Sequence, residues 1–535
     1  MLVSIFNDVI GPVMRGPSSS HCAAALRIGR LARDLMEGQF DDCLVEFDRA
    51  GSLPTTHDSQ GSDMGLFGGL LGWEATDERL PGSMQTLADS GVRIRIETID
   101  AGDPHPNTYR LTLSGPQGSI SLHAISTGGG MIEVIVLDGF DISLGGDAFT
   151  TLLWVQGGPQ GAATALRDEL ALREEVDAVC VHSRPEDAIT VVEIRSMAAL
   201  PAPLVAEVRH RPGVMRVREL APVLPILSRH DAAVPFSTAA ELLARDGAGA
   251  RALWQLGIEY EMARGGLDAA TVEAMMVDIV RILRRSIAAG IAGTSYADRV
   301  LGWQSGGFDE ALRQGRLLDG GALNRAILYV TALMEVKSSM GVIVAMPTAG
   351  ACAALPGVVI ALAEGMELDE VEMARAFLAA GLVGAFIATA WTFAAEVGGC
   401  QAEGGAASAM AAAALVGLAG GTAERSLAAA SMALQNMIGL ICDPIANRVE
   451  APCLGKNVSA AANALGSANM ALAGFDPVIP LDEVIETARR VAGQMPRELR
   501  CTALGGLSIT PTSLAIEARL AAARTGCGSG ACGCH

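Results

Sequence analysis

Lysine is nearly absent from this chain of 535 residues. Only Lys337 and Lys456 are lysines among 39 basic residues, and neither lies in the glycine-rich phosphate-binding context that pyridoxal phosphate chemistry requires. A general bias toward arginine explains most of the imbalance, and chance placement of the two lysines is a competing interpretation. A compact ammonium and a planar guanidinium are not interchangeable, so we single out both positions as candidates for a specific role.

Basic charge of any kind is also scarce. The 59 acidic residues outnumber the 39 basic ones and give a net charge of −20. Nucleic acids and anionic membranes bind basic surfaces, so the charge balance excludes both as predicted partners.

The sequence lacks an export signal and a disulfide pattern. Asn7 and Asp8 interrupt the first apolar stretch, where a secretory signal would need an unbroken one. Eleven unevenly spaced cysteines therefore indicate metal or thiol chemistry in a reducing cytoplasm. The uncharged run 376–395 is long enough to span a bilayer. Its alanine and glycine content, shared with 407–421, favours central helices of a packed core over a membrane span.

Three of the cysteines have the local sequence of metal ligands. Cys400, Cys442 and Cys453 each have glycine or proline nearby, which lets the backbone approach an inorganic cluster. A [4Fe–4S] cluster is normally held by four thiolates, so three would leave one iron open as a Lewis acid. The spacing matches no short ferredoxin motif, and three buried cysteines acting as small hydrophobic residues are the alternative.

A run of three serines precedes a predicted helix that begins near Cys22. Ser18, Ser19 or Ser20 would cap this helix and direct hydroxyls and backbone N–H groups toward one small anion. Three serines followed by His21 exceed what a cap requires. This favours a carboxylate-binding role over a plain helix cap.

Segments in both halves of the chain resemble the bacterial iron–sulfur L-serine dehydratases. Four segments resemble the alpha portion of that family: residues 346–350 (MPTAG), 396–457 around the three cysteines, 502–506 (TALGG) and 510–512 (TPT). Four further segments resemble the beta portion: residues 16–21 (GPSSSH), 51–63 (GSLPTTHDSQGSD), 105–107 (HPN) and 126–130 (STGGG). The resemblance covers most of residues 1–145 and 250–515. Several motifs in the same order make it specific.

The resemblance implies a reaction and a site. It implies that an open iron of a [4Fe–4S] cluster takes up the β-hydroxyl of L-serine or a close β-hydroxy amino acid, giving a 2-oxo acid and ammonia. The implied cluster ligands are Cys400, Cys442 and Cys453. The implied catalytic residues, with the two histidines as candidate bases, are Ser18, Ser19, Ser20, His21, His105 and Asn107. The implied substrate-binding residues are Thr348, Gly350 and Asn457, with Glu403 and Asp443 orienting the site.

Two positions depart from the family pattern. Gln60 stands where the family motif has histidine, and Lys337 stands where relatives have a small or amide residue. A lost imidazole and a gained cation suggest a substrate with a second anionic group, such as 3-hydroxyaspartate, which Lys337 would bind. His57 is the nearest imidazole that could replace the missing one. A non-catalytic, cluster-binding regulatory protein is the alternative from another functional class.

The predicted fold is multidomain. It comprises an N-terminal α/β (α+β) domain over residues 1–147, a βαββαβ module over 148–222, and an all-α catalytic domain over 236–520. The middle module resembles the ACT domain, which implies an amino-acid effector, although a spacer without a ligand is equally consistent with the sequence. A homodimer is expected from the family and from pairing of sheet edges.

Residues 521–535 are predicted to form a flexible, cysteine-rich tail. In part of the family a C-terminal cysteine caps the open iron, and Cys527, Cys532 and Cys534 are the candidates here. The competing interpretation is a metal-scavenging end in which His535 is an additional ligand.

Overall fold

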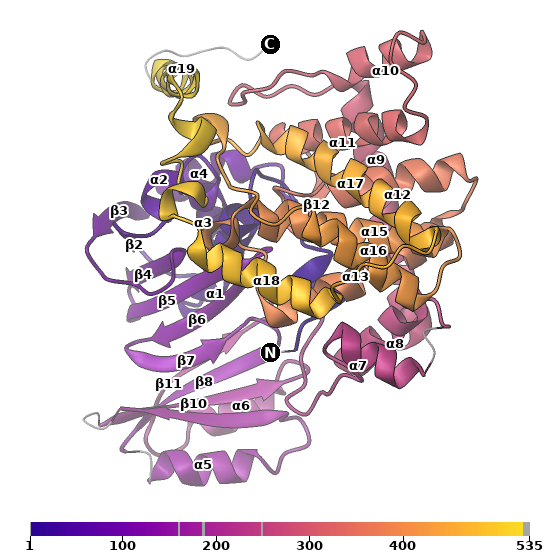
Figure 1. The fold of residues 1–535 in the computed structure, drawn as a ribbon. Helices are drawn as coiled ribbons and strands as arrows, with labels where there is room; N and C mark the ends of the chain where they lie inside the picture. The colour runs from indigo at the N-terminus through magenta and orange to yellow at the C-terminus, as the bar shows by residue number, and fades with distance from the viewer. Residues whose placement is uncertain (1, 159–160, 185–187, 248–249, 528–535) are drawn as a thin grey trace.

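The computed structural model describes residues 2–158, 161–184, 188–247 and 250–527. Sheets fill the N-terminal half of the chain and helices fill the C-terminal half, as Figure 1 shows by the change from indigo and magenta to orange and yellow. The predicted mixed, multidomain architecture is confirmed at this level.

A six-stranded sheet organises the first part of the chain. Its spatial order is β3-β2-β4-β5-β6-β7, and β2 pairs with β3 in parallel while the other neighbours are antiparallel. The strands are β2 (Asp42–Asp48), β3 (Arg93–Ile99), β4 (Thr108–Gly115), β5 (Gly118–Gly128), β6 (Met131–Leu137) and β7 (Phe140–Leu144). The helices of this part are α1 (Ala24–Leu35), α2 (Leu53–Thr56), α3 (Ser62–Leu70) and α4 (Ser83–Asp89). Alternate residues of β4 and β5 are buried, and α1 packs on β5 and β6.

The middle segment has the predicted βαββαβ order. Its elements are β8 (Phe149–Gln156), α5 (Ala162–Leu170), β9 (Ala178–Ser183), β10 (Ile189–Ser196), α6 (Ala202–Arg209) and β11 (Val214–Leu220). The strands form an antiparallel sheet in the order β11-β8-β10-β9, with its own small apolar core beneath the two helices. The element types and their order are confirmed.

The second half of the chain is helical, as predicted. Its helices are α7 (Ala239–Asp246), α8 (Leu253–Gly265), α9 (Ala269–Ala292), α10 (Ser305–Arg313), α11 (Ala322–Ser338), α12 (Ala354–Gly365), α13 (Glu370–Ala390), α14 (Ala395–Gly398), α15 (Ala406–Leu418), α16 (Ala423–Gln435), α17 (Cys453–Leu472), α18 (Leu481–Gln494) and α19 (Pro511–Cys527). One correction applies to the all-helical prediction. A short strand, β12 (Ile343–Val344), pairs with β1 (Val13–Met14), because the start of the chain inserts into this half.

Small residues of α13 allow that insertion. Ile5 and Val9 lie against Gly381 and Gly384, where an added Cβ would come within 2.4 Å and 2.1 Å of their side-chain carbons. α13 is the one described helix that is long and apolar enough to cross a membrane, and 78% of its most apolar window is buried inside the molecule. The helix is buried in the core, as its alanine and glycine content predicted.

Candidate active site and metal centre

The three predicted cysteine ligands are buried at the ends of helices in the C-terminal half. Cys400 follows α14, Cys442 lies in the loop after α16, and Cys453 begins α17. The thiol sulfurs of Cys400 and Cys442 and a carboxylate oxygen of Glu403 all lie within 4.8 Å of one another. Burial and the neighbouring Cys400 raise the pKa of Cys453. Crowded neutral thiols of this kind become thiolates when a cation binds them.

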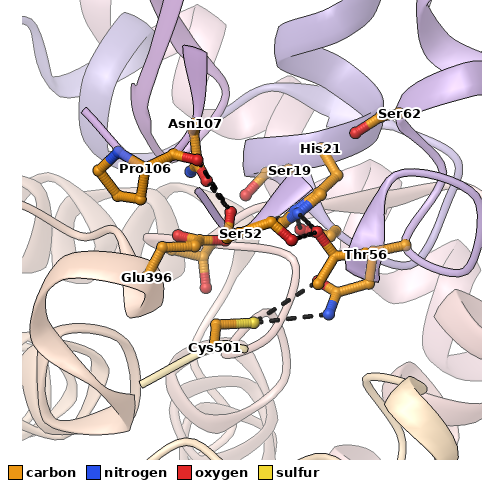
Figure 2. Close-up of polar contacts among 12 residues, drawn as sticks. Ser19, His21, Ser52, Thr56, Ser62, Pro106, Asn107, Glu396 and Cys501 are labelled. Atoms are coloured by element: carbon orange, nitrogen blue, oxygen red, sulfur yellow. Dashed lines mark hydrogen bonds and ion pairs between the residues drawn. The ribbon is translucent and has the colours of Figure 1, made fainter. Parts of the chain in front are cut away.

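A fourth buried thiol, which the sequence analysis missed, lies beside these residues. Cys501 is within hydrogen-bonding contact of Cys442, and its sulfur accepts a hydrogen bond from Gln60 Nε2 at 3.5 Å. Figure 2 shows Cys501 facing the side chains of the N-terminal half. The available signal was its position directly before the TALGG motif. A lone cysteine in a loop has no partner spacing that would have identified it.

Lys456 provides the positive charge nearest to the thiols. Its Nζ lies 3.7 Å from Cys400 Sγ and 2.6 Å from Asp443 Oδ1. Burial lowers the pKa of Lys456, but the charges of Cys400 and Asp443 outweigh burial and raise it overall. The other oxygen of Asp443 accepts the backbone N–H of Leu507 at 3.0 Å. The TALGG motif is therefore connected to the thiol cluster through one carboxylate.

Thr348 and Gly350 shape the surroundings of Glu403. The hydroxyl of Thr348 donates to Glu403 Oε1 at 2.7 Å. An added Cβ at Gly350 would lie 2.8 Å from the same oxygen, so only glycine fits there without displacing the carboxylate. Burial raises the pKa of Glu403.

Asn457 positions the backbone around Cys453. Its Nδ2 donates to the carbonyls of Gly350 at 2.8 Å and Cys453 at 2.9 Å. Its Oδ1 accepts the N–H groups of Ala353 and Ala354 at 3.3 Å and 3.0 Å. These four contacts use the whole hydrogen-bonding capacity of the amide. These contacts hold the backbone around Cys453, and the substrate contact that the resemblance implies for Asn457 stays a prediction.

His21 is the imidazole nearest to this cluster from the N-terminal half. Its Nε2 lies 2.8 Å from the hydroxyl of Thr56, and its Nδ1 lies 3.0 Å from Ser18 Oγ and 3.5 Å from Glu396 Oε1. Burial lowers the pKa of His21 to about 3. The ring is therefore neutral near pH 7, as a proton acceptor must be.

The predicted serine cap is wrong. The residues Ser19–Ala23 form a π-helical turn, and α1 begins after it at Ala24. Ser18 makes no side-chain cap, because its hydroxyl bonds to His21 instead. Ser19 Oγ accepts the backbone N–H of Ala349 at 3.1 Å, which joins the two halves of the molecule, and Ser20 is buried beside it.

Asn107 and Glu396 leave buried polar atoms without partners. Asn107 Oδ1 accepts a hydrogen bond from Ser52, while its Nδ2 and Glu396 Oε2 are buried and make no hydrogen bond of regular geometry among the described residues, although the amide is close enough to Glu396 to lower the pKa of that carboxyl. Burial raises the pKa of Glu396 to about 7. Figure 2 shows both side chains in the group that contains His21. Unpaired buried polar atoms are costly, so they mark a place where a polar ligand fits.

The STGGG motif brings these two halves together. Gly128 has a φ of +109°, and an added Cβ would lie 2.7 Å from the backbone nitrogen of Ala394, just before α14. Thr392 donates to the carbonyl of Thr127 at 2.9 Å in the same contact. Glycine is needed there because backbone meets backbone.

His105 lies in the turn that carries Asn107. It is half-buried, its Nδ1 accepts the backbone N–H of Asn107 at 3.2 Å, and burial lowers its pKa. Among the described residues, no hydrogen bond joins it to the thiols or to Glu396. Its observed contact orders the turn that carries Asn107.

The two departures from the family pattern have different surroundings. Gln60 donates to Asn447 Oδ1 at 2.9 Å and reaches Cys501, so it belongs to the site. His57 instead bonds both carboxylate oxygens of Asp63 at 2.8 Å. Burial lowers the pKa of His57, but Asp63 outweighs it and raises the pKa overall. Lys337 is 0% exposed and donates to the carbonyl of Val449.

The tail candidates fall at or beyond the limit of description. Cys532, Cys534 and His535 lie outside the described residues. Cys527 is the last residue of α19, and its side chain is also outside the description.

Comparisons with known proteins identify related chains for both halves. The family model for the serine dehydratase alpha chain matches residues 239–508. A probable L-serine dehydratase alpha chain of Bacillus subtilis (strain 168) is 38% identical over 239 residues, which covers 45% of this chain and 80% of the relative. A probable L-serine dehydratase alpha chain of Latilactobacillus sakei is 45% identical over 195 residues, which covers 36% of this chain and 93% of the relative. A probable L-serine dehydratase beta chain of Bacillus subtilis (strain 168) is 43% identical over 144 residues, covering 27% and 64%.

Buried thiols from one half of the chain face an imidazole, hydroxyls and a carboxylate from both halves, which is the arrangement of an enzyme active site with metal-binding capacity. The chain belongs to the L-serine dehydratase family, and it joins alpha and beta portions in one polypeptide. It is accordingly a lyase of that family.

Proposed function

We propose that this enzyme removes water from L-serine to give pyruvate and ammonia, using a [4Fe–4S] cluster held by Cys400, Cys442 and Cys453. The observation that carries the proposal is the group of buried thiols in the C-terminal half, where Glu396 of the same half lies 3.5 Å from the ring of His21 across the boundary between the two halves. Thiolates are the ligands that iron–sulfur clusters prefer, and Lys456 offsets their negative charge. The donor set therefore fits such a cluster.

When bound, the cluster would supply an open iron as a Lewis acid for the departing hydroxyl. The chain itself must remove the proton from the substrate Cα. Neutral His21 is the candidate base that the contacts favour, and Glu396, with its raised pKa, holds or releases a proton near neutral pH at 3.5 Å from the ring. His105 remains the second candidate base.

The substrate carboxylate needs donors as negative charge develops beside it. The unpaired Nδ2 of Asn107 and the hydroxyls of Ser19 and Ser20 lie on the N-terminal side, where they would hold that group opposite the thiols. Thr348 and Gly350 would keep Glu403 in place, and Asn457 would keep Cys453 in place. Substrate selection then rests mainly on the N-terminal side.

L-serine is favoured over a substrate with a second anionic group. The relatives named L-serine dehydratase support this choice, while Lys337 is fully buried and uses one of its three donors on the carbonyl of Val449. 3-Hydroxyaspartate and a non-catalytic regulatory role remain as alternative outcomes of one experiment. Anaerobically purified enzyme is tested for iron, sulfide and 2-oxo acid release from L-serine, L-threonine and 3-hydroxyaspartate stereoisomers. Iron with serine turnover supports the proposal, iron with hydroxyaspartate turnover replaces the substrate, and absence of iron refutes the mechanism.

We further propose the domain division 1–147, 148–222 and 236–520, with the middle module as an ACT-like effector-binding unit. A cavity of about 500 Å³ at its edge is lined by Asp147, Glu193 and Arg195. Asp147 and Arg195 form an ion pair at 3.0 Å, and their remaining atoms Asp147 Oδ2 and Arg195 Nε are buried without partners among the described residues. Opposite charges of this kind suit the ammonium and carboxylate of an amino acid. Calorimetric titration with amino acids tests the site, and light scattering tests the proposed homodimer.

A further inference from the structure

The site contains one more buried thiol than the proposed mechanism uses. Cys501 is 4% exposed and clusters with Cys400 and Cys442 around Ala395. Cys442 contacts the thiols of both Cys400 and Cys501. Three thiols thus converge from three separate segments of the C-terminal half, and Cys453, from a fourth segment, is close enough to Cys400 for that group to raise its pKa.

We infer that Cys501 is the fourth thiolate ligand of the cluster in the substrate-free enzyme. The inference rests on the proposed function, because it assigns a ligand to the iron that the other three cysteines leave open. A [4Fe–4S] cluster normally takes four thiolates, and four buried thiols supply that number. Ligation exchanges the S–H bond of Cys501 for an S–Fe bond and releases the proton to solvent, without electron transfer.

The backbone around Cys501 is anchored to the other ligand segments. Its N–H donates to the carbonyl of Ala395 at 3.4 Å, and the N–H of Cys442 donates to the carbonyl of Leu499 at 2.9 Å. The hydroxyl of Thr502 donates to the carbonyl of Arg497 at 3.1 Å. The cysteine is therefore held at the site by the fold itself, independently of the chain beyond α19.

Gln60 provides a partner for this thiol from the N-terminal half. Its Nε2 lies 3.5 Å from Cys501 Sγ, and its Oε1 lies 3.7 Å from the same sulfur. Asn447 orients the amide of Gln60 and is itself held by the carbonyl of Thr55 at 2.5 Å. An amide can donate to a thiolate and accept from a thiol, so Gln60 stabilises Cys501 both when it is bound to iron and when it is released.

The decisive experiment measures how readily the cluster loses one iron. An iron without a thiolate is lost first on mild oxidation, which leaves a [3Fe–4S] cluster with a characteristic paramagnetic resonance signal. Wild-type enzyme, Cys501→Ala, Cys501→Ser and a chain lacking residues 526–535 are purified anaerobically and oxidised under the same conditions. Cys43→Ala is the matched control, because Cys43 is a buried thiol in β2 of the N-terminal sheet.

Cys501→Ala should form the [3Fe–4S] signal several-fold faster than wild type, and Cys501→Ser should fall between them because a hydroxyl is a weaker iron ligand. Cys43→Ala and the truncated chain should behave like wild type. Equal rates in wild type and both Cys501 variants would overturn the inference, as would faster conversion only in the truncated chain. If Cys501→Ala fails to fold by circular dichroism, Cys501→Ser and the truncation decide the result. Wild-type enzyme without iron or sulfide would instead refute the proposed function.

Discussion

Two asparagines on opposite sides of the active site differ in how completely they are hydrogen-bonded. On the thiol side, Asn457 uses all four of its hydrogen bonds and Lys456 contacts a thiol, a carboxylate and a carbonyl. On the opposite side, Asn107 leaves its Nδ2 unpaired. A site that must hold a permanent group benefits from saturated contacts, whereas a site that binds and releases a substrate needs free donors. Under the proposed function, this is the difference expected between a cofactor-binding side and a substrate-binding side.

The largest expected effect is on the thiol side. Replacing Cys442 with alanine should sharply lower both iron content and turnover, because the cluster loses one of its proposed ligands and the neighbouring Cys501 is inferred to bind a different iron. Iron analysis and pyruvate release from L-serine measure the result. Cys43→Ala is the control and should retain both. Normal iron in Cys442→Ala would contradict the ligand assignment.

The next effect separates the two sides directly. His21→Asn should lower kcat by about 10²- to 10⁴-fold, the range expected for loss of a general base, while iron content stays at the wild-type level. Steady-state kinetics and iron analysis of the same preparation provide the measurement. His210→Asn, at an exposed position of the middle module, should change neither quantity. If His21→Asn lost iron as well as activity, this residue would belong to the cofactor side.

Glu396 predicts a pH dependence of stability. At pH values between the ordinary pKa of a glutamate and about 7, the folded protein keeps a proton on this carboxyl that the unfolded chain has released. The contribution of Glu396 to the free energy of unfolding therefore falls as the pH rises through that range. Glu396→Gln removes this dependence. The free energy of unfolding of the variant, measured relative to that of the wild type, should therefore rise by about 3 kcal/mol between pH 4 and pH 8. Urea unfolding of both proteins, prepared without iron, provides the measurement, and parallel pH profiles would contradict the predicted shift.

The smallest expected effect is structural. Asn457→Ala should lower the free energy of unfolding by about 1–3 kcal/mol, because it removes the partner of the buried carbonyl of Gly350 and of the N–H groups of Ala353 and Ala354. Asn469→Ala, at an exposed position of the same helix, should change it by less than about 0.5 kcal/mol. Urea unfolding compares the two variants. Equal values would show that Asn457 does not hold its loop.

Helices and strands were more predictable than the details of the site. Long alanine-rich periodic runs predicted α9 and α13, and alternating apolar residues predicted β8 to β11, because these patterns depend on the residues of one element alone. The insertion of Ile5 and Val9 beside α13 depends on close packing between distant segments, which periodicity does not reveal.

The site could be predicted only where a motif marked it. Cys400 and Cys442 were predicted to converge and do so. Ser18, Ser19 or Ser20 was expected to cap the following helix, with a carboxylate-binding role favoured over a plain cap, but the hydroxyl of Ser18 bonds to His21 and the chain turns in a π-helical conformation before α1. Cys501 and the pairing of Glu396 with His21 arise from tertiary contacts between the two halves, and no local pattern predicts them.

The measurement that tests the central claim most directly is iron and sulfide quantification on anaerobically purified enzyme, with pyruvate release from L-serine followed in the same sample. The account predicts iron and sulfide in equal amounts, serine turnover, and loss of both cluster and turnover on exposure to air. A colourless, iron-free protein that still turns over L-serine would contradict it.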